Sequence, residues 1–137
     1  MLRSTLNAQN RRIHTRYQLP SMYTEVAVRE LESDQFRSHG HAYDISLGGM
    51  RFELDELIEP GTRIAVRIQL PGPTFHHTQD KDRRAIFAMA TVVWTEQDDL
   101  DQGGPFRMAC VFKNFCQPGD EQRLLNQLSS GQYSRAA

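Results

Sequence analysis

Apolar residues recur at every second position over most of this chain, and a period of two is the spacing of a β-strand. Within residues 62–70, for example, alternate positions are filled by Ile64, Val66, Ile68 and Leu70. A strand places successive side chains on opposite faces of a sheet, so this pattern predicts one face packed in a core and one face in water. The pattern favours an all-β fold.

Six segments of the sequence carry this alternation or a continuous apolar run. They are residues 23–31, 36–44, 50–54, 62–70, 86–95 and 106–113. The fifth is apolar on both faces, so we expect it to be covered on both sides. Six short strands of one domain bury their apolar faces most readily by curling into a closed barrel, which also removes exposed sheet edges. The predicted architecture is therefore an all-β, six-stranded barrel.

The connections between the predicted strands differ in length. Gly61 follows a proline and marks a tight turn, whereas residues 71–84 form a polar segment longer than most hairpin loops. The role of that segment is not defined by its sequence. Near the C-terminus, Asp120 can cap a short helix whose apolar stripe is formed by Leu124, Leu125 and Leu128. We expect this helix to plug one end of the barrel.

Length and charge limit the number of domains and the kinds of partner. A chain of 137 residues, 39% of them hydrophobic, is long enough for one globular domain with its own core. The formal net charge is −1, and residues 1–20 contribute +4 through four arginines and no acid, which leaves −5 for the remainder. A basic arm on an acidic body favours an anionic ligand at the arm and argues against a protein that coats nucleic acid.

Cysteine content and hydropathy predict the compartment. Cys110 and Cys116 are the only cysteines, and their spacing fits neither a zinc site nor a redox pair. No apolar run approaches the roughly 20 residues that cross a bilayer, and the N-terminal residues lack the apolar centre of a signal peptide. We therefore expect a cytoplasmic protein without membrane insertion.

Two short motifs carry the candidate chemistry. Residues 11–16 read RRIHTR and bring three guanidinium groups together, and residues 44–49 read DISLGG where two predicted strands meet. Guanidinium groups bind phosphate, or the O6/N7 edge of guanine, through paired N–H donors. A carboxylate accepts the N–H donors on the opposite edge of guanine. Together the two motifs predict a site for a guanine nucleotide.

With these motifs the chain resembles the PilZ domain, the bacterial receptor module for cyclic di-GMP. The family's RxxxR signature matches residues 12–16, preceded by Arg11, and its D/NxSxxG signature matches residues 44–49. The resemblance covers nearly the whole chain and includes a late strand that ends in Val-Val-Trp at Trp94. It departs from the family at Ala109, where glycine is usual, and in the greater length of residues 71–84.

The resemblance implies a flexible basic arm, residues 1–18, and a PilZ barrel with its C-terminal helix, residues 19–131. It implies cyclic di-GMP as ligand, without a cofactor and without catalysis. The residues that it implies contact the ligand are Arg11, Arg12, Arg16, Asp44, Ser46 and Gly49. Gly49 is also expected to turn the chain. Trp94 is an additional candidate for stacking on a base, although such a residue is more often a core aromatic. We expect the arm to be loosely attached without ligand, and to become ordered with ligand and present a surface to an unidentified protein partner.

Each of these residues also has a simpler interpretation. The arginines of the arm could be a solvated basic tail, and Asp44 and Ser46 could form a local side-chain-to-backbone turn, which is compatible with ligand binding. A metal site could be imagined from His39, His41, His76 and His77, but exposed histidines are the commoner outcome. Cys110 falls on an apolar stripe and Cys116 lacks an activating neighbour, so neither is expected to be a nucleophile.

Three other functions remain open at this point. The chain could be a PilZ-like interaction module that works without nucleotide, although its intact motifs argue against that. It could bind single-stranded nucleic acid, as other small barrels do, but its body is acidic. An enzyme is disfavoured because Ser46, although near Asp44 and His41 in sequence, lies in no nucleophile elbow or phosphate loop.

Overall fold

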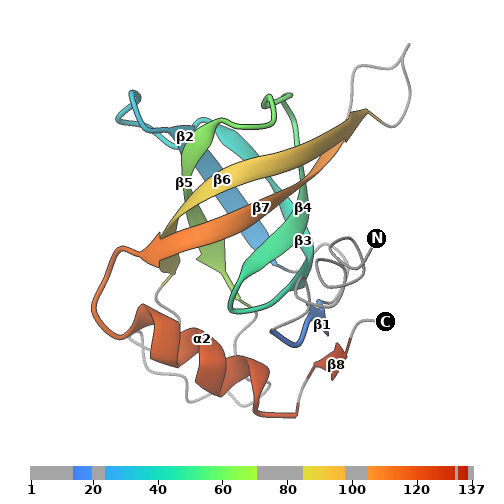
Figure 1. Cartoon of the computed structure of the whole chain (residues 1–137), viewed down its shortest axis with the longest axis vertical. Helices are drawn as coiled ribbons and strands as arrows, with labels where there is room; N and C mark the ends of the chain where they lie inside the picture. Colours follow the sequence, from blue (N-terminus) through green and yellow to red (C-terminus); the bar gives the residue numbers. More distant parts are fainter. Residues whose placement is uncertain (1–13, 20–23, 71–84, 98–104, 132, 136–137) are drawn as a thin grey trace, which may run out of the picture.

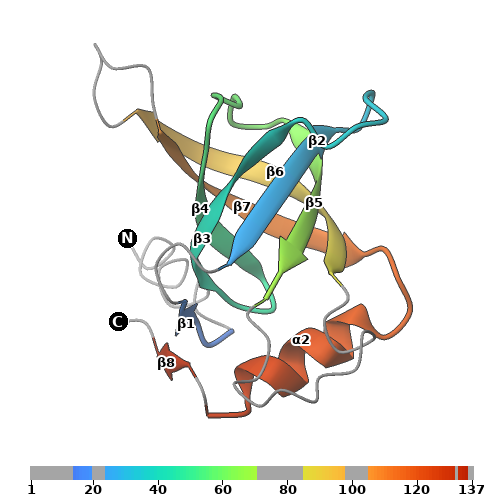
Figure 2. The same cartoon turned by 180° about the vertical axis from the view of Figure 1, so that it is seen from behind.

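The computed structural model describes residues 14–19, 24–70, 85–97, 105–131 and 133–135. Its main body is a closed antiparallel barrel (Figures 1 and 2). The barrel strands are β2 (Glu25–Glu30), β3 (Ser38–Ile45), β4 (Gly49–Leu54), β5 (Arg63–Gln69), β6 (Ile86–Gln97) and β7 (Phe106–Phe115). Their order is β2-β5-β6-β7-β4-β3, and the pairing of β3 with β2 closes the barrel. The predicted six-stranded all-β fold is confirmed.

The core lies inside the barrel and is filled by the predicted apolar faces. All four alternating residues of the β5 region, Ile64 to Leu70, are buried, while Arg63 and Arg67 point to solvent. Phe52 of β4 and Met108 of β7 have no exposed surface. Burying one such side chain is worth about 1.5–3 kcal/mol, so the inward face of each strand stabilises the closed barrel.

Strand β6 departs from the expectation that both its faces are covered. Its inward residues are buried, but Val93 and Trp94 are 48% and 40% exposed. The pairing with β7 shifts between Val92 and Trp94, which leaves Val93 as an extra residue. Such a β-bulge breaks the alternation of faces, so two consecutive apolar side chains reach the outer surface.

Two short strands that the sequence did not predict, one from each end of the described chain, pair with each other. Strand β1 (Tyr17–Gln18) pairs with β3, and β8 (Ser134–Arg135) pairs with β1 beside the barrel (Figures 1 and 2). Leu19 is buried, and its N–H donates to the carbonyl oxygen of Tyr43 at 2.9 Å. The last two residues of the predicted arm, Tyr17 and Gln18, are thus paired with the barrel, and residues 1–13 lie outside the described residues. The expected loose attachment of the arm without ligand stays a prediction.

Helix α2 (Asp120–Leu128) lies across one end of the barrel, as predicted (Figures 1 and 2). Leu124 and Leu128 are buried in the core, but Leu125 is 39% exposed, so the apolar stripe is narrower than expected. Leu125 follows Leu124 by one residue and is therefore turned about 100° away from it around the helix. Among the described residues, no helix is long and apolar enough to span a membrane.

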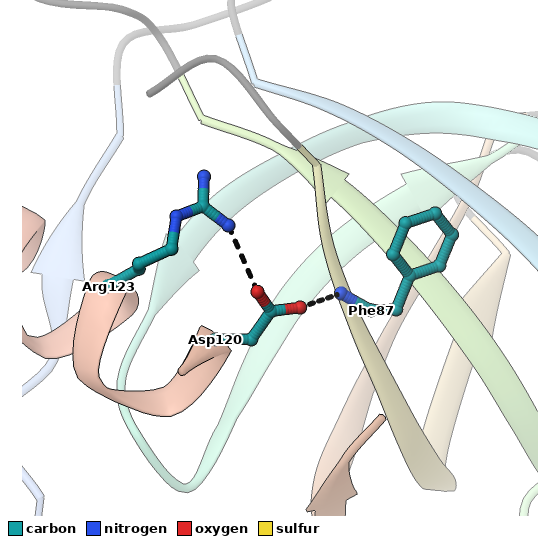
Figure 3. A network of polar contacts seen from close by, with 3 residues as sticks. All are labelled: Phe87, Asp120 and Arg123. Carbon is teal, nitrogen blue, oxygen red and sulfur yellow. Dashed lines mark hydrogen bonds and ion pairs between the residues drawn. The ribbon is translucent and has the colours of Figure 1, made fainter. Parts of the chain in front are cut away.

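Asp120 attaches this helix to the barrel (Figure 3). Its buried carboxylate accepts a hydrogen bond from the backbone N–H of Phe87 on β6 at 3.1 Å and another from Arg123 at 3.0 Å. The N-cap position belongs to Gly119, which has a φ of 85° and makes no side-chain cap. The predicted capping role of Asp120 is thus wrong, and the residue instead joins the first turn of α2 to a strand.

Candidate ligand-binding site

A hollow of about 480 Å³ on the outside of the barrel brings the two sequence motifs together. Strands β4, β6 and β7 form its floor, and the residues that precede β1 form part of its rim. Five of the sequence-predicted site residues line it: Arg16, Asp44, Ser46, Gly49 and Trp94. The other two, Arg11 and Arg12, lie outside the described residues. Segments that are far apart in the sequence therefore meet at one place.

A β-bulge in β3 directs Asp44 toward the hollow. The pairing with β4 shifts between Ala42 and Asp44, so Tyr43 is an extra residue. Strict alternation would put Asp44 on the core face together with Ala42, which is buried in the core cluster. The bulge turns Asp44 outward instead, as bulges beside binding sites commonly do.

Asp44 is bound by Arg51, a residue that the sequence analysis did not identify. Nε of Arg51 donates to Oδ2 of Asp44 at 2.7 Å, and Nη2 of Arg51 contacts the same oxygen. The Asp44 side chain is 4% exposed and that of Arg51 is 48% exposed, so a nearly buried carboxylate is paired with a cation at the surface. A buried carboxylate requires such a partner. Arg51 lies on the outward face of its strand, but the bulge that brings it opposite Asp44 has no clear sequence signal.

Ser46 has the local structural role that was predicted for it. Its Oγ accepts a hydrogen bond from the N–H of Gly48 at 3.0 Å, and its own N–H donates to the carbonyl oxygen of Gly49 at 2.8 Å. Asp44 does not share this role, because its carboxylate is bound by Arg51. The turn thus holds Ser46 at the edge of the hollow, with its side chain nearly buried.

The two glycines of the second motif allow close contacts. A Cβ atom on Gly49 would lie 2.2 Å from the carbonyl oxygen of Cys110, and one on Gly48 would lie 2.8 Å from Cδ2 of His14. Gly49 is the first residue of β4, and the left-handed glycines among the described residues are elsewhere. Gly49 is therefore needed for close strand packing, whereas the turn precedes it. Gly48 gives the His14 ring its place on the barrel, a contact that sequence reasoning missed.

The hollow also has an apolar part. Val93, Trp94 and Val111, which we call the apolar shelf, are among the exposed large hydrophobic residues of the described chain and all line the hollow. The hollow is therefore lined both by charged groups, among them Asp44 and Arg51, and by the apolar shelf. A nucleotide has the same division between a polar edge or phosphate and a flat apolar base, and bases stack readily on such surfaces.

Neither cysteine is an activated nucleophile, and the described residues form no metal site. Burial raises the pKa of the Cys110 thiol to about 12, so it is neutral at physiological pH. The pKa of Cys116 is also raised, chiefly by loss of hydration. Within the described ranges, no three His, Cys, Asp or Glu side chains gather as metal ligands, and His76 and His77 fall outside those ranges.

Comparison with known families agrees with this combination of barrel and motifs. The sequence profile of the PilZ domain matches residues 10–130, and the chain belongs to the PilZ domain family. The resemblance seen in the sequence is thereby confirmed. A search of curated protein sequences gave no significant match.

Two solved structures share the fold. The inhibitor of motility MotI/DgrA from Bacillus subtilis is 23% identical with a TM-score of 0.60, and the alignment covers 88% of this chain and 51% of that one. The PilZ domain of YcgR from Escherichia coli, solved with c-di-GMP, is 20% identical with a TM-score of 0.59. That alignment covers 88% of this chain and 92% of the YcgR domain. This chain spans about half the length of the Bacillus protein. At these identities the likeness concerns the fold.

Proposed function

We propose that this protein is a receptor for cyclic di-GMP, which binds in the hollow between the arm and the barrel. The observation that carries the proposal is the meeting of both family motifs in one hollow, with Arg16 from the first and Asp44 and Ser46 from the second. An arginine can bind phosphate, and a carboxylate can accept the N–H groups of guanine. The c-di-GMP in the structure of the YcgR domain, which has the same fold, supports this choice of ligand.

The contacts follow from the chemistry of each side of the hollow. Arg16 together with Arg11 and Arg12 binds the phosphates and guanine edges. Oδ2 of Asp44 is occupied by Arg51, but Oδ1 receives no hydrogen bond from the described residues and is the acceptor for guanine. A carboxylate has about four lone-pair sites, so both partners can be accommodated. Trp94 supplies a face for stacking.

We further propose that ligand binding fixes the arm on the barrel and so creates a surface for a protein partner. Ordering the backbone of one residue costs about 1–2 kcal/mol. The pairing of Tyr17 and Gln18 with β3, and the packing of His14 on Gly48, reduce the number of residues that the ligand must order. The free thiols of Cys110 and Cys116 are typical of a reducing compartment, and we place the receptor in the cytoplasm.

Calorimetric titration with cyclic di-GMP tests the binding proposal. We expect saturable binding by the wild-type chain, with affinity at least about tenfold lower for Arg16→Met and for Asp44→Asn, because each loses a charge-assisted contact. Arg63→Met is the matched control, since Arg63 is an exposed arginine on β5 that does not line the hollow. Cyclic di-GMP recovered after incubation should be chemically intact. A silent wild-type titration, or full affinity in both site variants, would refute the proposal.

One observation favours the alternative, a PilZ module that binds a protein without nucleotide. Asp44 is already neutralised by Arg51 before any ligand is present, and the apolar shelf is a surface that a protein could also cover. Under this alternative the titration with cyclic di-GMP shows no heat of binding. The same experiment therefore separates the two functions.

A further inference from the structure

Four residues of the hollow form a single row across four adjacent strands. Asp44 of β3 is opposite Arg51 of β4, Arg51 is opposite Ala109 of β7, and Ala109 is opposite Trp94 of β6. All four line the hollow. Because neighbouring strands lie about 4.8 Å apart, the row places a carboxylate, a guanidinium, a methyl group and an indole along roughly 14 Å of one surface.

The two charged members of the row keep hydrogen-bonding groups for a ligand. Arg51 uses Nε and one N–H of Nη2 on Oδ2 of Asp44, which leaves the outer N–H of Nη2, both N–H groups of Nη1 and Oδ1 of Asp44 without a hydrogen bond from the described residues. Arg51 is half exposed and belongs to the wall of the hollow. The ion pair joins the two groups at their Nη2 and Oδ2 atoms, so a ligand that reaches the outer N–H of Nη2 also meets the carboxylate.

The donor of Arg51 and the acceptor of Asp44 match the hydrogen-bonding edge of guanine and do not match that of adenine. The base-pairing edge of guanine carries the O6 acceptor next to the N1–H donor, whereas adenine has an amino donor next to the N1 acceptor. An arginine N–H beside a carboxylate oxygen matches the first arrangement and leaves both groups unpaired against the second. Sites that hydrogen-bond one ligand discriminate strongly against a ligand that leaves their polar groups unpaired.

We propose that Arg51 is a specificity-determining residue that reads O6 of guanine while Asp44 reads the adjacent N–H, an inference that rests on the proposed cyclic di-GMP receptor function. The base lies across Ala109, whose small side chain leaves about two strand spacings, roughly 9.6 Å, between Arg51 and Trp94. Trp94 borders the base on the far side. The row thus reads O6 and N1–H of the base, while the arginines of the arm bind the phosphates and the remaining guanine edges.

The test compares three cyclic dinucleotides on the intact chain: cyclic di-GMP, cyclic di-AMP and the inosine analogue cyclic di-IMP. Inosine keeps O6 and N1–H but lacks the 2-amino group. For the wild type we expect cyclic di-GMP to bind about 100-fold more tightly than cyclic di-AMP. Arg51→Met should reduce this preference about tenfold or more, because only cyclic di-GMP loses the contact at O6. The ratio of cyclic di-GMP to cyclic di-IMP should not change, because both bases carry O6.

The control is Arg107→Met, which removes the same charge from a neighbouring position of β7 outside the lining of the hollow. This variant should keep the wild-type preference between the two bases. Circular dichroism checks the fold of each variant. If Arg51→Met does not fold, Arg51→Lys serves instead, since it keeps a cation for Asp44 but loses the planar fork, and it should also lower the preference for guanine.

The possible outcomes separate failure of this inference from failure of the proposed function. A wild type that does not bind cyclic di-GMP refutes the receptor function. A wild type that binds cyclic di-GMP and cyclic di-AMP equally refutes base reading alone. Equal losses for both nucleotides in Arg51→Met would show that Arg51 attracts phosphate only. A fall in the ratio of cyclic di-GMP to cyclic di-IMP would show that Arg51 supports a contact to the 2-amino group and not to O6, which also overturns the inference.

Discussion

The backbone of Gly49 approaches Cys110 so closely that a Cβ atom on Gly49 would lie 2.2 Å from the carbonyl oxygen of Cys110. Gly49 is also directly opposite Val111, which belongs to the apolar shelf. The glycine that ends the second motif therefore lets β4 and β7 approach at the floor of the hollow. Its place in the motif is explained by packing, without any requirement for a left-handed backbone.

Gly49→Ala should destabilise the barrel. The added Cβ collides with a backbone atom that cannot move independently, so we expect a loss of about 1–3 kcal/mol in the free energy of unfolding, measured by chemical denaturation. The matched control is Gly48→Ala, whose Cβ meets side chains instead of backbone: the ring of His14 at 2.8 Å and, in ordinary contact, Oγ of Ser46 at 3.6 Å. That variant should keep its stability within about 0.5 kcal/mol but bind cyclic di-GMP more weakly. Equal stability of the two variants would contradict the packing explanation.

The buried carboxylate of Asp120 should be needed for the attachment of α2. Asp120→Asn weakens its hydrogen bonds with the Phe87 N–H and with Arg123, and we expect unfolding to become easier by about 1.5–3 kcal/mol. Glu121→Gln removes the same charge from the same helical turn, but from an exposed position, so it controls for the helix dipole. Thermal unfolding compares the two variants. A loss of the same size in both would mean that the dipole, and not the buried contacts, dominates.

The thiol of Cys110 should make the stability of the protein fall at alkaline pH. Its pKa is raised from 9.0 to about 12, so above pH 9 the unfolded chain releases a proton that the folded chain retains. The stability from the neutral thiol is fully present below pH 9 and is lost as the pH rises toward 12. The limiting slope is about 1.4 kcal/mol per pH unit.

Denaturation of wild type and Cys110→Ala at several pH values between 8 and about 10.5 checks this expectation. The variant should show the shallower decline, because it has no proton to lose at this position. Cys116→Ser is the control: its thiol is exposed, so its removal should change the slope much less. Parallel pH profiles for wild type and Cys110→Ala would show that the buried thiol does not contribute.

Trp94 should report ligand binding, because it is the only tryptophan of the chain and borders the hollow. We expect its fluorescence to change on titration with cyclic di-GMP, with the same midpoint as the calorimetric titration. Trp94→Leu should weaken binding by about 1–3 kcal/mol through loss of stacking, and Trp94→Phe should retain part of it. Unchanged emission together with full affinity in Trp94→Leu would remove Trp94 from the site.

Much of the barrel could be predicted from the sequence, because a strand with one face in a core has a local signature. The period of two correctly indicated all six barrel strands, and the two motifs identified residues that line the hollow. The helix was predicted at its observed position, but Leu125 was wrongly included in its buried face. The short strands β1 and β8 were missed, since two residues are too few to show a period.

From the sequence alone we could predict the six barrel strands, the faces that enter the core and the residue types of the proposed nucleotide site. The outward position of Asp44, its pairing with Arg51 and the place of Trp94 in the same row could be seen only in the folded barrel. Periodicity is a property of one strand, whereas register is a property of two. The bulges at Tyr43 and Val93 each shift a register by one residue, and such a shift moves a side chain from the core face to the face that lines the hollow.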